Sequence, residues 1–445
     1  MKTYNSIIIG SGLGGLTAGA LLALWGKKVL VLEQHYIAGG CATAFKRKDF
    51  LMEVGLHEID GLHNQDFKRP IMELLGLFEG VEFLKIPELY HIRKGGFSYV
   101  LSEGKQAEEQ LKRDFPKEEK NINDFFITIE RLYKEMHQMP RGKWLRRLIY
   151  PLMPLLYPTI ASTSRLTAGE WLDKHFKDER LKTILTANMC YYTDDPFNLS
   201  LMYFLVAQGS YLNGGGHFVR GGSQNLSNYL VHFIEQHGGQ VLTGKYAKEI
   251  LIENNRAIGV AYHDTFNRTN PVVKVYADTV IANAAQPNVA PMLPEPQCRV
   301  LQKRIVKLRP ACSLLSVYLG FNIDLRELGV THYSNVILNK TLKSLKDMKD
   351  DAHSPWAERS FTFVNYGVID SQLCPKGKSF GVICTTDNLA DWDELDDKDY
   401  QEQKEVVART LLKRLEKEYP TILNYLEYYE VATPKTIHRY TLNPA

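Results

Sequence analysis

The apolar positions near the start of the chain predict a strand, a helix and a second strand. The apolar run Ile7–Ile9 favours a strand over residues 5–9, and small and apolar residues favour a helix over about 14–25 that ends at Gly26. A second apolar run predicts a strand over 28–33 that ends in Glu33. This order of elements is typical of an α/β fold with a parallel sheet.

The pattern changes in the middle of the chain. Residues 105–190 are strongly charged, and apolar residues recur at helical spacing over 121–136, which predicts a separate and mostly helical region. From Gly221 a turn and a helix are expected. Short β-runs follow at about 240–243, 248–252, 257–262 and 272–276. These runs predict that a second segment of the chain belongs to the first domain.

Strand-like runs return in the last third of the chain. They occupy residues 314–321, 360–368 and 379–386, and an amphipathic helix is expected near 401–418. We therefore predict a second domain that is assembled from two separated segments.

Composition and charge exclude several classes of protein. The 445 residues are 44% hydrophobic, and 54 Lys and Arg nearly balance 51 Asp and Glu, so nucleic-acid binding is not expected. The six cysteines lack the spacing of a metal site or a disulfide framework, so no metal is expected. The first residues lack the pattern of a secretory signal, which favours a cytoplasmic location.

The stretch "IIIGSGLGGL", residues 7–16, places three glycines between the first strand and the first helix. Gly10 allows a tight turn, Gly12 lets the backbone approach a pyrophosphate, and Gly15 lets helix and strand pack closely. The helix N-terminus adds free N–H groups and positive partial charge. The stretch predicts a dinucleotide site, and a purely structural strand–helix–strand unit is the alternative.

Two later features narrow the choice of nucleotide. Glu33, 23 residues after Gly10, is placed to accept hydrogen bonds from both ribose hydroxyls, and its charge disfavours the 2′-phosphate of NADP. Gly39 and Gly40 offer a second backbone approach to the same nucleotide. Nicotinamide dehydrogenases do not need that second contact, so the pair favours FAD over NAD.

With these motifs the sequence resembles the FAD-dependent amine-oxidase and phytoene-desaturase superfamily, which joins a glycine loop, a ribose Glu and a following Gly-Gly. "VGLHEI" at 54–59 and "RGGSQNL" at 220–226 are most similar to the branch of phytoene desaturase, carotenoid isomerase and retinol saturase. The resemblance implies FAD as cofactor. The implied contacts are Gly10, Gly12, Leu13, Gly14, Gly15, Glu33, Gln34, Gly39, Gly40 and Cys41.

The resemblance also implies the fold. We expect an α/β protein with a discontinuous Rossmann-like FAD-binding domain, glutathione-reductase-like but without a second NAD(P) domain, and an inserted α+β substrate domain. The expected parts are 1–75 and 216–300 for FAD, 76–215 (mainly helical) and 301–430 (sheet plus helix) for substrate, and 431–445 as the start of a third FAD part.

The last stretch, "TPKTIHRYTLNPA" at 433–445, resembles the segment that leads into the closing flavin-binding part of the family. We expect the sequence to be a fragment that lacks this part. A partner chain that supplies it, or a protein that holds FAD weakly and is inactive, are the alternatives.

The function implied by the resemblance is FAD-dependent desaturation, saturation or isomerisation of carbon–carbon double bonds in an apolar polyene or isoprenoid, carotenoid-like or retinoid-like. Electrons would come from or go to an external partner. A flavin amine oxidase, which acts on C–N bonds, is one alternative. A non-catalytic prenyl-lipid carrier of related fold is another, although the glycine loops of such carriers are degenerate and this one is intact.

Candidate catalytic groups are few. The resemblance places His57 near the flavin, with Glu53 or Glu58 as a polar anchor. The alternative is that His57 only forms hydrogen bonds within its own loop. Arg220 is interpreted either as a partner of phosphate or flavin oxygen or as a surface arginine. We assign no catalytic acid or base.

Two apolar stretches bear on the substrate. Residues 141–162 combine Arg141, Lys143, Arg146 and Arg147 with aromatic and leucine residues, and prolines break the run. They fit a segment in a bilayer interface, where a polyene could enter, or a buried helix hairpin. The tyrosine-rich residues 189–218 fit an apolar tunnel to the flavin or an ordinary core.

Overall fold

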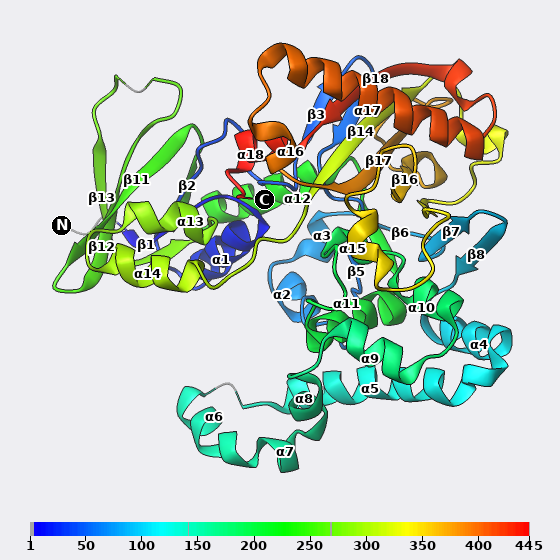
Figure 1. Ribbon diagram of the computed structural model, residues 1–445. Coiled ribbons are helices and arrows are strands. Elements are labelled where there is room, and N and C mark those ends of the chain that lie inside the picture. The colour runs from blue at the N-terminus through cyan, green and yellow to red at the C-terminus, as the bar shows by residue number, and fades with distance from the viewer. Residues whose placement is uncertain (1–3, 141, 268, 445) are drawn as a thin grey trace.

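The computed structural model describes residues 4–140, 142–267 and 269–444. Over these residues the chain forms two large sheets, one towards each side of Figure 1, with a group of helices below the second sheet. The sheets are assembled from segments far apart in the sequence.

The first large sheet has six strands in the order β10-β2-β1-β13-β12-β11. Its strands are β1 (Tyr4–Ile9), β2 (Val29–Leu32), β10 (Gln240–Leu242), β11 (Lys245–Glu253), β12 (Arg256–Asp264) and β13 (Val273–Ala282). The first four in the sheet order are parallel, and β13, β12 and β11 form an antiparallel meander. Two parts of the chain, one before residue 33 and one after residue 239, therefore share one sheet.

The apolar runs of β1 and β2 are continuous because both faces of this sheet are covered. Ile8 packs with α1 (Leu13–Leu24) and α12 (Ser223–Gln236), whereas Ile7 and Ile9 pack on the other face against residues of β11 and β12. Alternate side chains of one strand thus enter two separate cores.

The second large sheet has seven strands in the order β18-β14-β17-β16-β15-β7-β8. Its strands are β7 (Tyr90–Lys94), β8 (Phe97–Leu101), β14 (Ser313–Phe321), β15 (Ser334–Ile337), β16 (Phe361–Asn365), β17 (Ser379–Asp387) and β18 (Leu426–Ala432). Helix α17 (Asp397–Glu418) covers one face through Leu411 and Leu415. The sheet joins a hairpin from the first quarter of the chain to strands from its last third.

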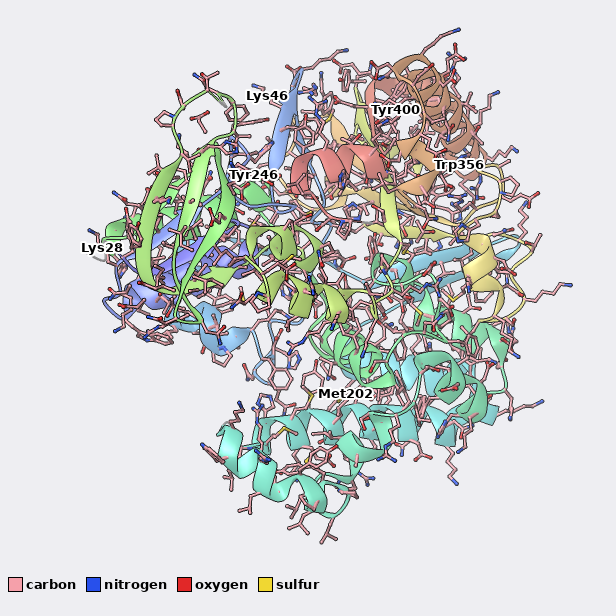
Figure 2. The ribbon with its side chains drawn as sticks, turned by 60° about the vertical axis from the view of Figure 1, so that its left-hand side comes forward. Lys28, Lys46, Met202, Tyr246, Trp356 and Tyr400 are labelled. Carbon is pink, nitrogen blue, oxygen red and sulfur yellow. The ribbon has the colours of Figure 1, made fainter. Side chains whose placement is uncertain are left out.

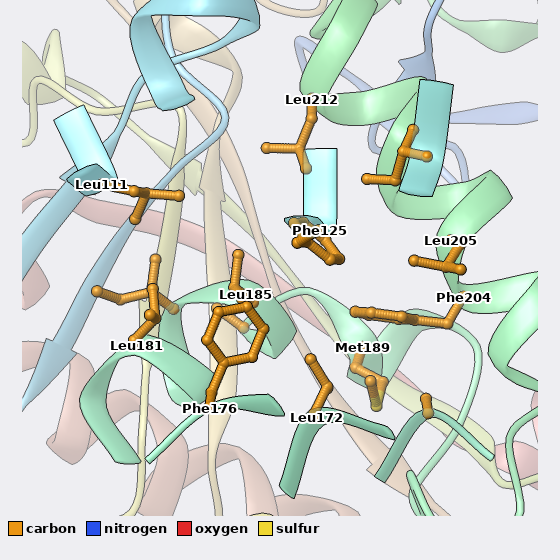
Figure 3. Close-up of a cluster of buried hydrophobic side chains, with 14 of the residues drawn as sticks. Leu111, Phe125, Leu172, Phe176, Leu181, Leu185, Met189, Phe204, Leu205 and Leu212 are labelled. Carbon is orange, nitrogen blue, oxygen red and sulfur yellow. The ribbon is translucent and has the colours of Figure 1, made fainter. Parts of the chain in front are cut away.

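A helical layer lies next to this sheet and surrounds a large apolar core. Its helices are α4 (Gly104–Asp114), α5 (Glu119–Gln138), α9 (Ala168–His175), α10 (Glu179–Thr186) and α11 (Leu201–Gly214). Phe125 is fully buried at its centre, with its ring near those of Phe176 and Phe204 (Figure 3). The ring of Trp171 is also close to it.

Shorter elements connect these layers. The strands are β3 (Ala44–Arg47), β4 (Phe50–Glu53), β5 (Ile59–Asp60), β6 (Phe83–Lys85) and β9 (Gly216–Val219). The helices are α2 (Arg69–Leu74), α3 (Leu77–Gly80), α6 (Lys143–Ile149), α7 (Met153–Leu156), α8 (Pro158–Thr163), α13 (Gln286–Val289), α14 (Gln297–Ile305), α15 (Asp347–Asp351), α16 (Ala390–Asp393) and α18 (Pro434–Thr441). Short 3-10 turns include η2 (Tyr150–Leu152), η3 (Met189–Tyr191) and η6 (Tyr366–Val368).

The predicted α/β architecture is confirmed, and most predicted elements are present within a few residues. The strand predicted over 360–368 is wrong in its second half: β16 ends at Asn365, whose side chain accepts a hydrogen bond from the N–H of Gly367 and begins a 3-10 turn. The residues of that turn include Tyr366 and Val368, whose aromatic and β-branched side chains are also typical of a strand. The exact domain boundaries stay a prediction.

We predict that Phe125→Ala lowers the free energy of unfolding by about 3–5 kcal/mol, because it leaves a cavity among rings that cannot all relax into it. Equilibrium urea unfolding measures the change. Phe266, an exposed phenylalanine, provides the control, and Phe266→Ala should change the same quantity by less than about 0.5 kcal/mol. Equal effects of the two substitutions would contradict the assignment of Phe125 to the core.

Candidate active site

A cavity of about 1450 Å³ is lined by residues of both large sheets. Gly10, Gly12 and Glu33 line it from the first sheet, and Ser316 and Cys384 line it from the second. Pockets for small ligands usually occupy about 300–1,000 Å³, so this one has room for a dinucleotide together with a second molecule.

The glycine loop is held by Asn283, the residue that follows β13. The Asn283 N–H donates to the carbonyl of Ile9 at 2.8 Å. A Cβ on Gly10, whose φ is +95°, would lie 2.4 Å from the Asn283 carbonyl oxygen, and a Cβ on Gly15 would lie 2.2 Å from the carbonyl oxygen of Gly10. Both positions therefore require glycine.

The N-terminus of α1 is free to receive an anion. No described side chain caps it, and its first turn contains no acidic residue. Gly12 lines the cavity there. Leu13 packs against the core beneath the sheet, and Gly14 is exposed outside the cavity lining. Because backbone N–H groups and the helix dipole favour negative charge, this end of the cavity suits a phosphate.

Glu33 lies at the carboxyl end of β2 and is buried at the edge of the cavity. Its Oε2 accepts hydrogen bonds from Ser11 N at 2.8 Å and Ser11 Oγ at 2.6 Å, and its Oε1 accepts one from His35 N at 2.8 Å. These bonds fix the carboxylate next to the glycine loop. Sequence reasoning missed the role of Ser11, although its place between two loop glycines was a usable signal.

Gly39 and Gly40 pack the following loop onto the glycine loop. Gly39 N donates to the carbonyl of Ser11 at 3.1 Å, and a Cβ on Gly40 would lie 3.1 Å from the Cα of Gly12. Gly40, Cys41 and the neighbouring Gln34 line the cavity, but Gly39 does not. The pair thus brings two backbone segments into contact, and only its second member faces the cavity.

The far end of the cavity is formed by η3, β14 and β17, and the lining residues of these three elements are uncharged. The described residues that line it there are Cys190, Tyr191, Tyr192, Cys312, Ser313, Leu314, Ser316, Tyr318 and Cys384. Charged side chains that line the same cavity, among them Arg47, Lys404 and Glu430, belong to other elements. Burial raises the pKa of Cys190 to about 11 and that of Cys312 to about 12, so these thiols are neutral at pH 7.

His57 lines this end and contacts Tyr191. The His57 Nδ1 and the Tyr191 hydroxyl lie 2.9 Å apart, and the two rings meet edge to face. Burial lowers the pKa of His57 to about 4, so the imidazole is neutral at pH 7. Tyr191 lies in the stretch 189–218, for which a tunnel or an ordinary core is expected, and no motif or spacing in the sequence singles it out.

Glu53 and Glu58 lie outside the cavity lining, so the expectation of a polar anchor is wrong for both. Glu53 accepts hydrogen bonds from Ser223 N at 2.7 Å and Ser223 Oγ at 2.5 Å, and so ties β4 to the start of α12. Burial raises the pKa of Glu53 to about 7. Burial also raises the pKa of Glu58 to about 8.

Arg220 is a surface arginine and does not reach the cavity. Its guanidinium pairs with the Glu82 carboxylate at 2.9 and 3.0 Å and also with Asp370. These acidic residues are far from Arg220 in the sequence, so the sequence does not indicate that Arg220 pairs with them.

The two apolar stretches, 141–162 and 189–218, differ in whether they line the cavity. Only residues 190–192 of the stretch 189–218 line the cavity, because α11 contributes to the helical core through residues such as Phe204 and Leu205. No described residue of 141–162 lines it, and Arg141 lies outside the described residues. None of the helices in the described part of the chain is long and apolar enough to cross a membrane.

Comparison with known proteins identifies the family. The model of the family described as "Flavin containing amine oxidoreductase" matches residues 13–433. The chain belongs to this family. It is therefore a flavin-dependent oxidoreductase, as the sequence predicted, and the family implies a flavin cofactor.

Two curated relatives agree with the branch that the motifs indicated. The chain is 26% identical to the chloroplastic prolycopene isomerase of Daucus carota over 453 residues, which is 99% of this chain and 70% of the relative. It is 29% identical to the all-trans-retinol 13,14-reductase of Danio rerio over 486 residues, 100% of this chain and 77% of the relative.

Solved structures share the fold. An oxidoreductase from Methanosarcina mazei matches with a TM-score of 0.62 and 18% identity, covering 98% of this chain and 90% of that one. Putrescine oxidase bound to putrescine matches with a TM-score of 0.62 and 14% identity, covering 97% and 84%. These similarities confirm the predicted discontinuous FAD-domain type of fold.

We predict that Glu58 makes the protein less stable as the pH rises. Its pKa is raised from the ordinary 4.5 to about 8, so the folded chain binds this proton more tightly than the unfolded chain. The free energy of unfolding should fall between about pH 4.5 and pH 8, by up to about 1.4 kcal/mol per pH unit from this group. Glu58→Gln removes that slope.

Urea unfolding at a series of pH values measures the difference between the two chains. Glu79→Gln, at an exposed position on α3, is the control and should leave the slope unchanged. Parallel curves for the unaltered chain and Glu58→Gln would contradict the prediction.

Proposed function

We propose that this protein is an FAD-dependent oxidoreductase that acts on carbon–carbon double bonds of an apolar polyene or isoprenoid, by desaturation, saturation or isomerisation. One observation carries the proposal: a single cavity joins the glycine loop and the Glu33 carboxylate to an uncharged wall at η3, β14 and β17. A nucleotide and an apolar molecule can therefore occupy one continuous space.

The first end of the cavity fits the adenosine diphosphate part of FAD. Gly10 and Gly12 expose backbone at the uncapped N-terminus of α1, where a pyrophosphate is stabilised. The Glu33 carboxylate is fixed by Ser11 and His35 and retains acceptor capacity towards a ribose hydroxyl. Gly40 and Cys41 would cover the nucleotide from the next loop.

Bound FAD would supply the electron transfer, and the residues of the chain would bind and orient the substrate and exclude water. In the tautomer of neutral His57 that carries its proton on Nδ1, the imidazole would donate to the Tyr191 oxygen and leave the Tyr191 hydroxyl proton available on the wall of the cavity. Burial raises the pKa of Tyr191 well above its ordinary value, so the proton stays on the Oη atom at pH 7.

The substrate class is supported by the relatives and by the uncharged wall. The two relatives are named for prolycopene and all-trans-retinol, both conjugated polyenes, and we extend that class to this chain. The electron donor or acceptor is proposed to be external.

We predict that Glu33→Ala raises the Kd for FAD by about tenfold or more, because a charge-assisted hydrogen bond to the ribose is lost. Titration of the apoprotein, followed by flavin fluorescence, measures this Kd. Glu79→Ala is the matched control and should leave the Kd unchanged. A Glu33→Ala chain with the original Kd would contradict the ribose assignment, and an unaltered chain that takes up no FAD would contradict the proposed function.

We predict that Tyr191→Phe lowers turnover of a conjugated polyene by about 100-fold while FAD binding stays the same, because the ring is kept and only the proton donor is lost. Single-turnover kinetics with a carotenoid and with a retinoid, followed by polyene absorbance, measure the rate. Tyr229→Phe on α12, outside the cavity lining, is the control.

A primary amine assayed in parallel separates the two enzyme classes. Faster turnover of the amine than of either polyene, with release of peroxide, would identify an amine oxidase and overturn the proposed substrate class.

A further inference from the structure

The segment 143–158, here called the α6–α7 tip, exposes large apolar side chains to solvent. Trp144 is 83% exposed, Leu148 is 74% exposed and Leu155 is 78% exposed. Leu145, Tyr150, Leu152 and Leu156 are exposed as well. Such residues scattered singly are ordinary, but a contiguous group of them marks a surface that contacts something else.

The tip projects from the helical layer. It leaves α5 and returns through α8 at the lower edge of Figure 1, away from both large sheets. With side chains drawn, Figure 2 again shows it at the lower edge of the molecule, with side chains extending into open space.

The base of the tip is firmly attached, so its exposure is a fixed property of the fold. The Glu135 carboxylate of α5 accepts hydrogen bonds from Thr159 N at 3.0 Å and Ile160 N at 2.9 Å, the first N–H groups of α8. Met153 and Tyr157 pack against the helical core. Only the outer side chains are left without protein contacts that bury them.

The charges around the tip are of one sign. No Asp or Glu occurs between Glu135 and Glu170, whereas Lys143, Arg146 and Arg147 are exposed on α6. Trp144 and Leu148 are four residues apart and share one side of the helix, as do Lys143 and Arg147. A basic group thus lies next to the apolar group.

We propose that the α6–α7 tip is a membrane-docking surface that inserts its apolar side chains into the interface of a bilayer with anionic headgroups. Trp, Tyr and Leu side chains beside Arg and Lys match that interface, because the apolar groups enter the acyl boundary and the cations pair with lipid phosphates. The prolines and short helices of the tip keep it in the interface and do not span the bilayer.

Docking at the tip is separate from substrate entry. No described residue of the tip lines the cavity, so the tip anchors the protein without forming a channel for the substrate. The proposal therefore stands apart from the proposed function, and it holds whether or not the protein acts on a polyene.

Cosedimentation of the full chain with phosphatidylcholine vesicles, with and without phosphatidylglycerol, tests the proposal. The unaltered chain should bind the anionic vesicles more tightly. Combined Trp144→Ser, Leu148→Ser and Leu155→Ser should weaken this binding at least about tenfold. Combined Arg146→Gln and Arg147→Gln should weaken it about tenfold on anionic vesicles and have little effect on neutral ones.

The matched control replaces three apolar residues that are exposed elsewhere, Phe266→Ser, Val306→Ser and Leu308→Ser, and it should bind like the unaltered chain. Because all these side chains are exposed, the thermal midpoints should agree. A second readout uses lipids brominated in their acyl chains: they should quench the fluorescence of the unaltered chain, and Trp144→Phe, which keeps an apolar ring, should remove that quenching.

Vesicle binding that the tip substitutions leave unchanged, or that the control substitutions weaken equally, would overturn the proposal. So would a dimer in sedimentation equilibrium that the tip substitutions convert to a monomer, with no vesicle binding by either form. That outcome would identify the tip as a contact between two copies of the chain.

Discussion

The nucleotide end of this protein depends on one contact, the packing of Asn283 against the glycine loop. Asn283 follows β13, and its backbone lies so close to Gly10 that position 10 has no room for any side chain. The same contact aligns β13 beside β1 and fixes where the cavity begins. The loop therefore has its shape because a distant strand holds it, and the local turn alone does not account for it.

A second layer of contacts converts this loop into a binding site. Ser11 bonds both to Glu33 and to the loop that contains Gly39, so one residue positions the Glu33 carboxylate and the Gly39–Gly40 pair relative to the glycine loop. The far wall is set by η3 and by β14 and β17 of a different sheet, and these two strands come from the last third of the chain. The cavity exists because two sheets, each discontinuous in sequence, meet across it.

The sequence alone predicted the local elements well, and it singled out Gly10, Gly12 and Glu33, which line the cavity, because these features depend on short-range patterns. A strand, three glycines, a helix and Glu33 follow one another within a few dozen residues. The sequence did not predict side-chain contacts between residues that are far apart along the chain. The acidic partners of Arg220, the Ser223 partner of Glu53 and the contact between His57 and Tyr191 join residues more than 130 positions apart. No periodicity or spacing encodes such pairs.

The distance between Gly10 and Asn283, 273 residues, also has a consequence for synthesis. At about 5–20 residues per second, a ribosome needs roughly 15–50 s to travel between them. During that interval β1 lacks its partner β13, and β2 lacks β10, so the apolar residues Ile7–Ile9 and Val29–Leu32 lie on strands with unpaired edges. The nascent chain thus passes through a long period in which its first strands require protection from aggregation, and the contact of Asn283 that shapes the glycine loop can form only after most of the chain has emerged.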